Sequence, residues 1–147
     1  MPLPPFSADA LTVLLAFLLG AAIGAEREWR RHPGGLRSCA LVAAAAAVFA
    51  RIAAEHSGTN PGAALGAIAT GVGFLGAGVI LRRGTAVRGL STAATFWAVA
   101  AVGTAAGLRE YGMAVGLTVL VFFAHVMLRQ LSAWIERRAP PSEPGPR

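Results

Sequence analysis

The chain has 147 residues, of which 55% are hydrophobic and 14% charged, and its mean hydropathy is +0.59. This composition is too apolar for an ordinary soluble domain of this length, so we predict an all-α integral membrane protein. The net charge of +6 comes from thirteen Arg residues at the ends of apolar segments, not from a basic face that could bind nucleic acid. The single cysteine, Cys39, excludes an internal disulfide and a cysteine-based metal cage.

Five apolar runs are long enough to cross a bilayer as helices, which takes about 20 residues. The predicted spans cover about residues 8–25, 36–54, 62–81, 90–108 and 111–131. Together they are predicted to form a bundle of five transmembrane helices. This bundle makes residues 1–138 a single transmembrane domain. The proline-rich residues 139–147 have too little apolar content to pack and are predicted to form a disordered cytoplasmic tail.

The arginines are distributed unevenly between the predicted loops. Eleven lie between spans one and two, between spans three and four, or after span five. The other side has two, Arg51 and Arg109. Because cytoplasmic loops carry the excess of positive charge, we predict an N-terminus outside the membrane and a C-terminus in the cytoplasm.

The first span ends in the charged residues Glu26 and Arg27. An acidic side chain at the membrane edge is costly unless it is solvated or paired, so it favours a functional role. Arg37 and Arg88 begin the second and fourth spans and could reach Glu26. Three roles stay open for this group: a structural staple between loops, contact with a ligand or partner, and coordination of a cation by Glu26, a weak metal-ligand candidate.

The third span is rich in glycine, which membrane helices use to bring backbones close together. Gly62, Gly66, Gly73 and Gly76 fall within about 80° on a helical wheel, with Gly71 and Gly78 on the opposite face. This pattern predicts a central helix gripped by neighbours on two sides. A helix broken near Gly71–Gly73, with freed backbone groups facing a cavity, is the alternative.

Pairs of small residues four apart occur in three other spans. Such pairs serve packing within one chain or between copies, so a homodimer is a further expectation. The pairs are Gly20 and Gly24, Gly103 and Gly107, and Gly112 and Gly116.

Hydroxyl residues open the fourth span directly after Arg88. Ser91, Thr92 and Thr95 are placed to cap the helix N-terminus, whose positive end favours anions. With Arg88 they would form a site for a small anion or a lipid phosphate, and capping alone is the alternative. His125, near the inner edge of the fifth span, is expected to be neutral and hydrogen-bonded.

The second and fourth spans each begin with a Gly-Leu turn. Spans one and two form one hairpin around a basic loop, and spans three and four form a similar one. Gly35-Leu36 follows the first basic loop, and Gly89-Leu90 follows the second. We expect the two turns to meet on the cytoplasmic face.

Enzymatic chemistry is not indicated. No nucleophile pairs with a base, no His, Cys and acidic residues fall at metal-ligand spacing, and no nucleotide-binding loop is present. We expect no catalytic residue and no resident cofactor, with Mg²⁺ open as a ligand. The leading interpretation is a protein that contacts another membrane complex. The alternative is an ion or small-solute transporter or channel component, with Glu26 near the path and Thr70, Thr95, Thr104 and Thr118 as mid-span polar groups.

Several strings of this chain resemble the MgtC/SapB family of bacterial inner-membrane proteins, in family order from about residue 15 to 131. The matching strings are Gly20-Ala-Ala-Ile-Gly-Ala-Glu-Arg27, Gly34-Gly-Leu-Arg-Ser38, Gly71-Val-Gly-Phe-Leu-Gly-Ala-Gly-Val-Ile80 and Val87-Arg-Gly-Leu-Ser-Thr-Ala-Ala94.

The resemblance implies a five-span domain in the bacterial inner membrane and a role in magnesium homeostasis, with virulence in some pathogens. It implies ATP synthase as a partner that is bound and restrained, and functional positions at Glu26, Arg27, Arg37, Arg88 and the run 71–78. This chain departs from longer members, which append a cytoplasmic domain. It also has Ser91 and Ala98 where the founding type has Asn and Cys, and no acid or Arg in the loop 57–63.

Overall fold

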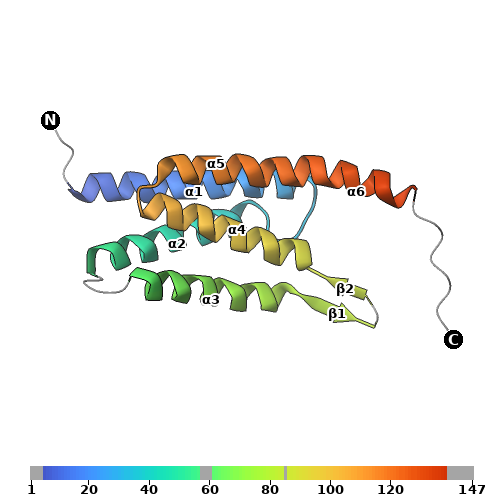
Figure 1. The fold of residues 1–147 in the computed structure, drawn as a ribbon, viewed down its shortest axis with the longest axis horizontal. Helices are drawn as coiled ribbons and strands as arrows, with labels where there is room; N and C mark the ends of the chain where they lie inside the picture. Colours follow the sequence, from blue (N-terminus) through green and yellow to red (C-terminus); the bar gives the residue numbers. More distant parts are fainter. Residues whose placement is uncertain (1–4, 57–60, 85, 139–147) are drawn as a thin grey trace.

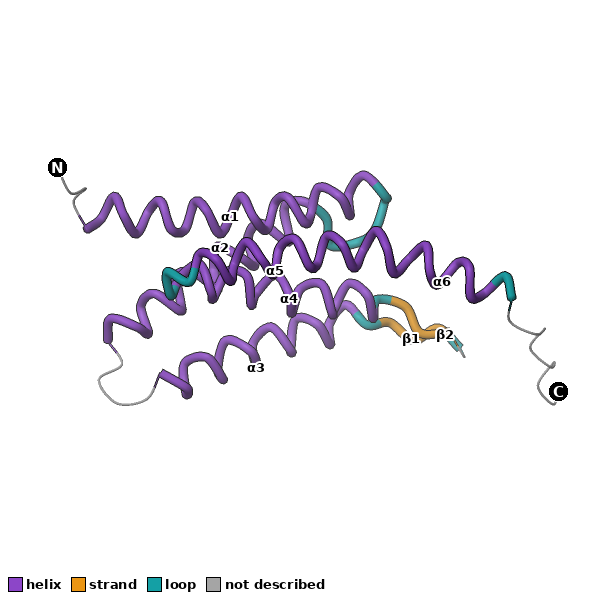
Figure 2. The backbone as a smooth tube through the Cα atoms, turned by 45° about the horizontal axis from the view of Figure 1, so that its top comes forward, coloured by secondary structure: helices purple, strands orange, loops and turns teal. Residues whose placement is uncertain are grey.

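The computed structural model describes residues 5–56, 61–84 and 86–138. Its helices run back and forth along one axis, and the start of α1 and the end of α6 lie at opposite ends of the bundle (Figure 1). A short antiparallel hairpin separates the third helix from the fourth, and the last helix continues through a π-helical turn (Figure 2). The elements are α1 (Pro5–Trp29), α2 (Leu36–His56), α3 (Pro61–Val79), β1 (Leu81–Arg83), β2 (Ala86–Arg88), α4 (Leu90–Gly107), α5 (Tyr111–Phe123), η1 (Ala124–Leu128) and α6 (Arg129–Glu136).

Within the described residues, five helical stretches are long and apolar enough to cross a membrane, which confirms the predicted number. They are Ala8–Trp29, Leu36–His56, Gly62–Val79, Leu90–Gly107 and Tyr111–Glu136. The first continues beyond the predicted end at residue 25, and the last continues beyond residue 131. Good helix formers occur in both extensions: Glu26, Arg27 and Glu28 in the first, and Ala133 and Glu136 in the last. The hairpin was not predicted, and the tail predicted at 139–147 lies outside the described residues.

Helix α4 is the centre of the bundle. It packs against α1, α2, α3 and α5. Helix α3 packs only lightly on α2 and mainly on α4. Only 11% of the residues in its apolar stretch are buried, against 56% for α4. The prediction of α3 as a central helix gripped on two faces is therefore wrong for the single chain.

The core between α1, α2 and α4 consists of small side chains. Helix α2 buries one alanine-rich stripe at helical spacing, which includes Cys39, Ala43, Ala47 and Ala50. Four glycines let neighbouring backbones approach this stripe. A Cβ added at Gly20 would lie 2.6 Å from the carbonyl oxygen of Cys39, and one at Gly24 would lie 2.7 Å from Cα of Leu36. A Cβ at Gly103 or Gly107 would overlap the carbonyl oxygens of Ala43 and Ala47.

Six other glycines within the described helices have open space where a side chain would be. No described atom outside its own helix lies within 4 Å of a Cβ built at Gly66, Gly71, Gly73, Gly78, Gly112 or Gly116. In α3, a Cβ built at Gly76 would lie 3.4 Å from Cβ of Ala93 in α4. Gly62 is exposed at the start of α3. That these open glycines pack against a helix of another chain stays a prediction.

The bundle end opposite the arginine-rich loops is joined by polar contacts. The carboxylate of Asp9 in α1 accepts from Nε of Arg51 in α2 at 2.7 Å and from Nη2 of Arg109 at 3.0 Å. The hydroxyls of Thr12 and Tyr111 lie 2.9 Å apart. These contacts tie α1 to α2 and to the turn between α4 and α5.

Candidate functional site

A buried arginine organises the arginine-rich end of the bundle. Arg27 lies in the last turns of α1 and is 1% exposed. Its Nη2 donates to the carbonyl oxygen of Pro33 at 2.8 Å and to Oγ1 of Thr92 at 2.9 Å. Its Nη1 donates to Oγ1 of Thr95 at 2.9 Å, and its Nε donates to the carbonyl oxygen of Gly34 at 3.2 Å. One side chain therefore links α1, the loop to α2, and α4.

The positive charge of Arg27 has no ionic partner. Among the described residues, no carboxylate lies within ion-pair distance of its guanidinium. Neutral oxygens alone solvate it, although buried charges are usually paired. A guanidinium has five N–H donors, and the four acceptors above leave one N–H of Nη1 without a described acceptor.

The carboxylate of Glu26 lies close to Arg30 and His125. It forms an ion pair with Arg30, which follows directly after the end of α1. Its Oε2 lies 3.4 Å from Nδ1 of His125, which belongs to the π-helical turn η1. Nε2 of His125 lies 3.1 Å from Oγ1 of Thr95, so the expected hydrogen bond of this histidine is present. Single π-helical turns occur frequently at functional sites.

These side chains border a polar pocket of about 300 Å³ at the arginine-rich end. Helix α1 and its loop contribute Glu26, Arg27, Arg30 and His32, and Ser91 comes from α4. The remaining lining residues belong to the last helix: Ala124, His125, Leu128, Arg129 and Ser132. The pocket therefore lies between the ends of α1 and α4 and the η1–α6 segment.

The structure corrects two predictions about this end of the molecule. Arg37 and Arg88 are exposed and do not pair with Glu26, which instead pairs with Arg30 and His125. The hydroxyls at the start of α4 do not cap the helix. Its N-cap position is Gly89, in a left-handed conformation with φ 95° and without a side-chain cap.

The two threonines instead support Arg27. The Thr92 hydroxyl donates to the carbonyl oxygen of Pro33 at 3.3 Å, and the Thr95 hydroxyl donates to that of Ser91 at 2.8 Å. The same two hydroxyls accept from Arg27. The bond between Thr92 and Pro33 joins the segments beside the two Gly-Leu turns, and a meeting of the turns themselves stays a prediction.

Several pocket residues were not predicted as site residues, namely Arg30, His32, Arg129 and Ser132. Nothing in their local sequence separates them from the other charged and polar residues of the loops. Arg30 and His32 follow the end of α1, and Arg129 and Ser132 lie on the last helix, so only the folded chain brings them together.

No metal centre is formed by the described residues, since no three His, Cys, Asp or Glu side chains come together in a suitable cluster. Glu26, the weak metal-ligand candidate, has Arg30 and His125 as its neighbours. The positive charge of Arg30 competes with a cation for this carboxylate.

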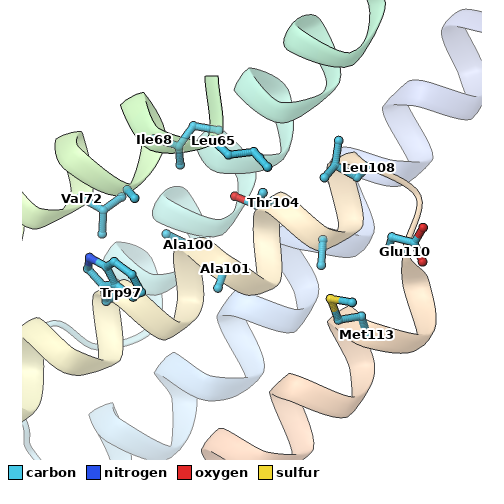
Figure 3. A pocket seen from close by; sticks show the side chains of 12 residues that line it. Leu65, Ile68, Val72, Trp97, Ala100, Ala101, Thr104, Leu108, Glu110 and Met113 are labelled. Atoms are coloured by element: carbon cyan, nitrogen blue, oxygen red, sulfur yellow. The ribbon is translucent and has the colours of Figure 1, made fainter. Parts of the chain in front are cut away.

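Two apolar grooves flank α3 within the span region. One has a volume of about 350 Å³ and lies between α3, α4 and the start of α5, where Trp97, Thr104 and Met113 point into it (Figure 3). The other, about 620 Å³, lies between α2 and α3 and includes Phe49 and Gly71. Helix α3 thus rests on α4 with an apolar hollow on each side.

Comparisons with known proteins agree with the resemblance seen in the sequence. The MgtC family model matches residues 13–134. Protein MgtC of Salmonella typhimurium (strain 14028s) is 46% identical over 127 residues, which is 86% of this chain and 55% of that protein. Protein MgtC of Brucella abortus (strain 2308) is 41% identical over 136 residues, covering 92% and 57%.

An uncharacterized protein of Synechocystis is 41% identical over 129 residues, covering 87% of this chain and 55% of that protein. No solved structure matches. The chain spans about half the length of the curated relatives it matches. The family match over most of the chain, together with five helices long enough to cross a membrane, shows that this multi-pass membrane protein belongs to the MgtC family.

Proposed function

We propose that the chain is a non-enzymatic protein of the bacterial inner membrane that acts by contact with another membrane complex, in magnesium or ion homeostasis or in stress adaptation. Its N-terminus lies outside and its arginine-rich end lies in the cytoplasm, in accordance with the positive-inside rule. The role in magnesium homeostasis rests on family membership. ATP synthase is the candidate partner that the family resemblance implies.

The observation that carries this proposal is the apolar interior between the two polar ends. Ala43, Ala47, Val99 and Val102 are fully buried there. The buried polar side chains of the described residues are Thr12, Arg27, Thr92 and Thr95, which belong to the two ends. A path for a hydrated ion needs polar groups along its length.

The predicted mid-span polar residues do not line such a path. The hydroxyls of Thr70 and Thr118 donate to carbonyl oxygens of their own helices, at 2.9 and 2.8 Å. Thr95 belongs to the Arg27 network, and Thr104 borders the apolar groove of Figure 3. This arrangement supports contact and disfavours transport.

Helix α3 is the element best suited to such a contact. It packs lightly on its own chain, and Phe74 on its outer side is 81% exposed. Glycines such as Gly71 and Gly78 leave room for a neighbouring backbone. In lipid, small residues favour helix association because they allow close packing.

Substitution of Gly71 by leucine tests this role. Open space at Gly71 predicts that the variant folds like the wild type, while its side chain occupies the groove beside α2 and blocks a partner helix. In a bacterium lacking its own MgtC, we expect the wild-type chain to restore growth at low magnesium and Gly71→Leu to lose this effect. The measurement is growth at matched protein levels in the membrane.

Ala22→Leu is the matched control, because Ala22 is an exposed small residue on α1, whereas α3 packs mainly on α4 and lightly on α2. It should restore growth like the wild type. Full growth with Gly71→Leu would contradict the assignment of α3 as the contact helix.

A further inference from the structure

The charges around the pocket at the arginine-rich end do not balance. Three arginines border it, Arg27, Arg30 and Arg129, against one carboxylate. Glu26 is already paired with Arg30. Neither Arg27 nor Arg129 has a carboxylate within ion-pair distance among the described residues.

Arg27 makes this imbalance significant because its charge is buried. A buried cation that only neutral oxygens solvate is stabilised further by an anion nearby. One N–H of its Nη1 has no described acceptor, and Arg27 is one of the residues that line the pocket. The hydrogen bonds of Arg27 therefore leave one donor unused at a residue that lines the pocket.

The lining chemistry fits an oxyanion with several acceptor oxygens. Arg129, on the last helix, also lines the pocket, and the hydroxyls of Ser91 and Ser132 add neutral donors. Arginine and hydroxyl donors are the groups that proteins use to hold phosphate. The volume of about 300 Å³ lies at the lower end of the range for ligand pockets.

Two exposed tryptophans indicate that this end of the molecule is at the level expected for phospholipid headgroups. Trp29 and Trp134 stand near pocket residues in the sequence, 90% and 51% exposed, and exposed tryptophans of membrane proteins gather at the interface. We infer that this pocket binds a phosphate group, carried either by a phospholipid headgroup or by a soluble phosphate. The site is centred on Arg27 and Arg129, unlike the anion site expected at Arg88, and it does not depend on any partner complex.

Binding can be measured on the purified full-length chain in a maltoside detergent, which carries no phosphate. Inorganic phosphate is titrated in one arm, and phosphatidylglycerol is added in the other. The readout is the rise in unfolding temperature with ligand concentration, because a ligand that binds only the folded state stabilises it. A rise with inorganic phosphate assigns a soluble source, and a rise with phosphatidylglycerol alone assigns the lipid.

Arg129→Gln and Arg137→Gln form a matched pair. Both remove one exposed charge from the last segment, but only Arg129 borders the pocket. Loss of one charge-assisted contact should weaken the apparent affinity about tenfold for Arg129→Gln, whereas Arg137→Gln should bind like the wild type. No stabilisation by either ligand, or equal weakening in both variants, would overturn the inference, and the second result would indicate general attraction of anions to the basic end.

Discussion

Replacement of Arg27 by methionine is expected to destabilise the folded protein by roughly 3–5 kcal/mol. The substitution keeps an unbranched side chain but removes the donors to the carbonyl oxygens of Pro33 and Gly34 and to the hydroxyls of Thr92 and Thr95. Buried acceptors left without donors lose their hydration with no compensating bond. The measurement is the free energy of unfolding of the purified protein in detergent.

Arg37→Met is the control for this variant. Arg37 belongs to the same basic end but is exposed, so its replacement should change stability by less than about 0.5 kcal/mol. Arg27→Lys should retain the charge and still lose much of the stability, since an ammonium group cannot reach four separated acceptors from one point. Equal stability of Arg27→Met and Arg37→Met would contradict the organising role of Arg27.

Replacement of Gly103 by alanine is expected to have a similarly large effect, roughly 3 kcal/mol or more. The added Cβ would overlap the carbonyl oxygen of Ala43, which is backbone and cannot move aside as a side chain can. Helices α2 and α4 would have to separate, and the alanine stripe of α2 would lose its close contact with α4. Thermal unfolding in detergent, or the yield of folded protein, reports the loss.

Gly116→Ala provides the comparison, because a Cβ at Gly116 meets no atom within 4 Å. This variant should be as stable as the wild type or slightly more stable, since alanine favours helix more than glycine does. If both alanine variants were equally stable, the close approach of α2 and α4 would not be as described.

The sequence predicted the five helices because apolar length is a local property. Each span could be recognised from its own residues, and the arginine clusters marked its ends. The ends themselves were less predictable. Helix α1 continues through Glu26 and Arg27 to Trp29, because charged residues remain good helix formers beyond the apolar stretch.

The position of α3 was not predictable from its glycines. A glycine-rich helix is expected wherever backbones approach closely, but the pattern does not say whether the neighbour belongs to the same chain. The close approaches occur at glycines of α1 and α4, such as Gly20 and Gly103, while those of α3 are mostly open. Their sequence contexts are alike, and tertiary packing alone separates them.

The site was partly predicted. Glu26, Arg27 and the α4 hydroxyls were identified as polar groups at a membrane edge, but their pairing was wrong. Arg27 bonds to threonines that lie 65 and 68 positions further along the chain and to two carbonyl oxygens, which carry no mark in the sequence. Spacing on one helix cannot reveal such a network.

The two proposals concern separate parts of the molecule. Contact with a membrane complex is assigned to α3, which lies at the edge of the bundle, and phosphate binding is assigned to the pocket between α1, α4 and the last helix. Gly71→Leu and Arg129→Gln therefore test them independently. A phosphate group bound beside Arg27 would also supply the missing counter-charge of the network that holds α1 and α4 together.

Magnesium flux into liposomes tests most directly whether the protein acts by contact and not by transport. The purified chain is reconstituted, and entry of Mg²⁺ is followed with an enclosed fluorescent indicator, with Glu26→Gln and empty liposomes in parallel. The apolar interior predicts no flux above that of empty liposomes for either protein. Flux through the wild type that Glu26→Gln abolishes would contradict the contact mechanism and assign the chain as a carrier.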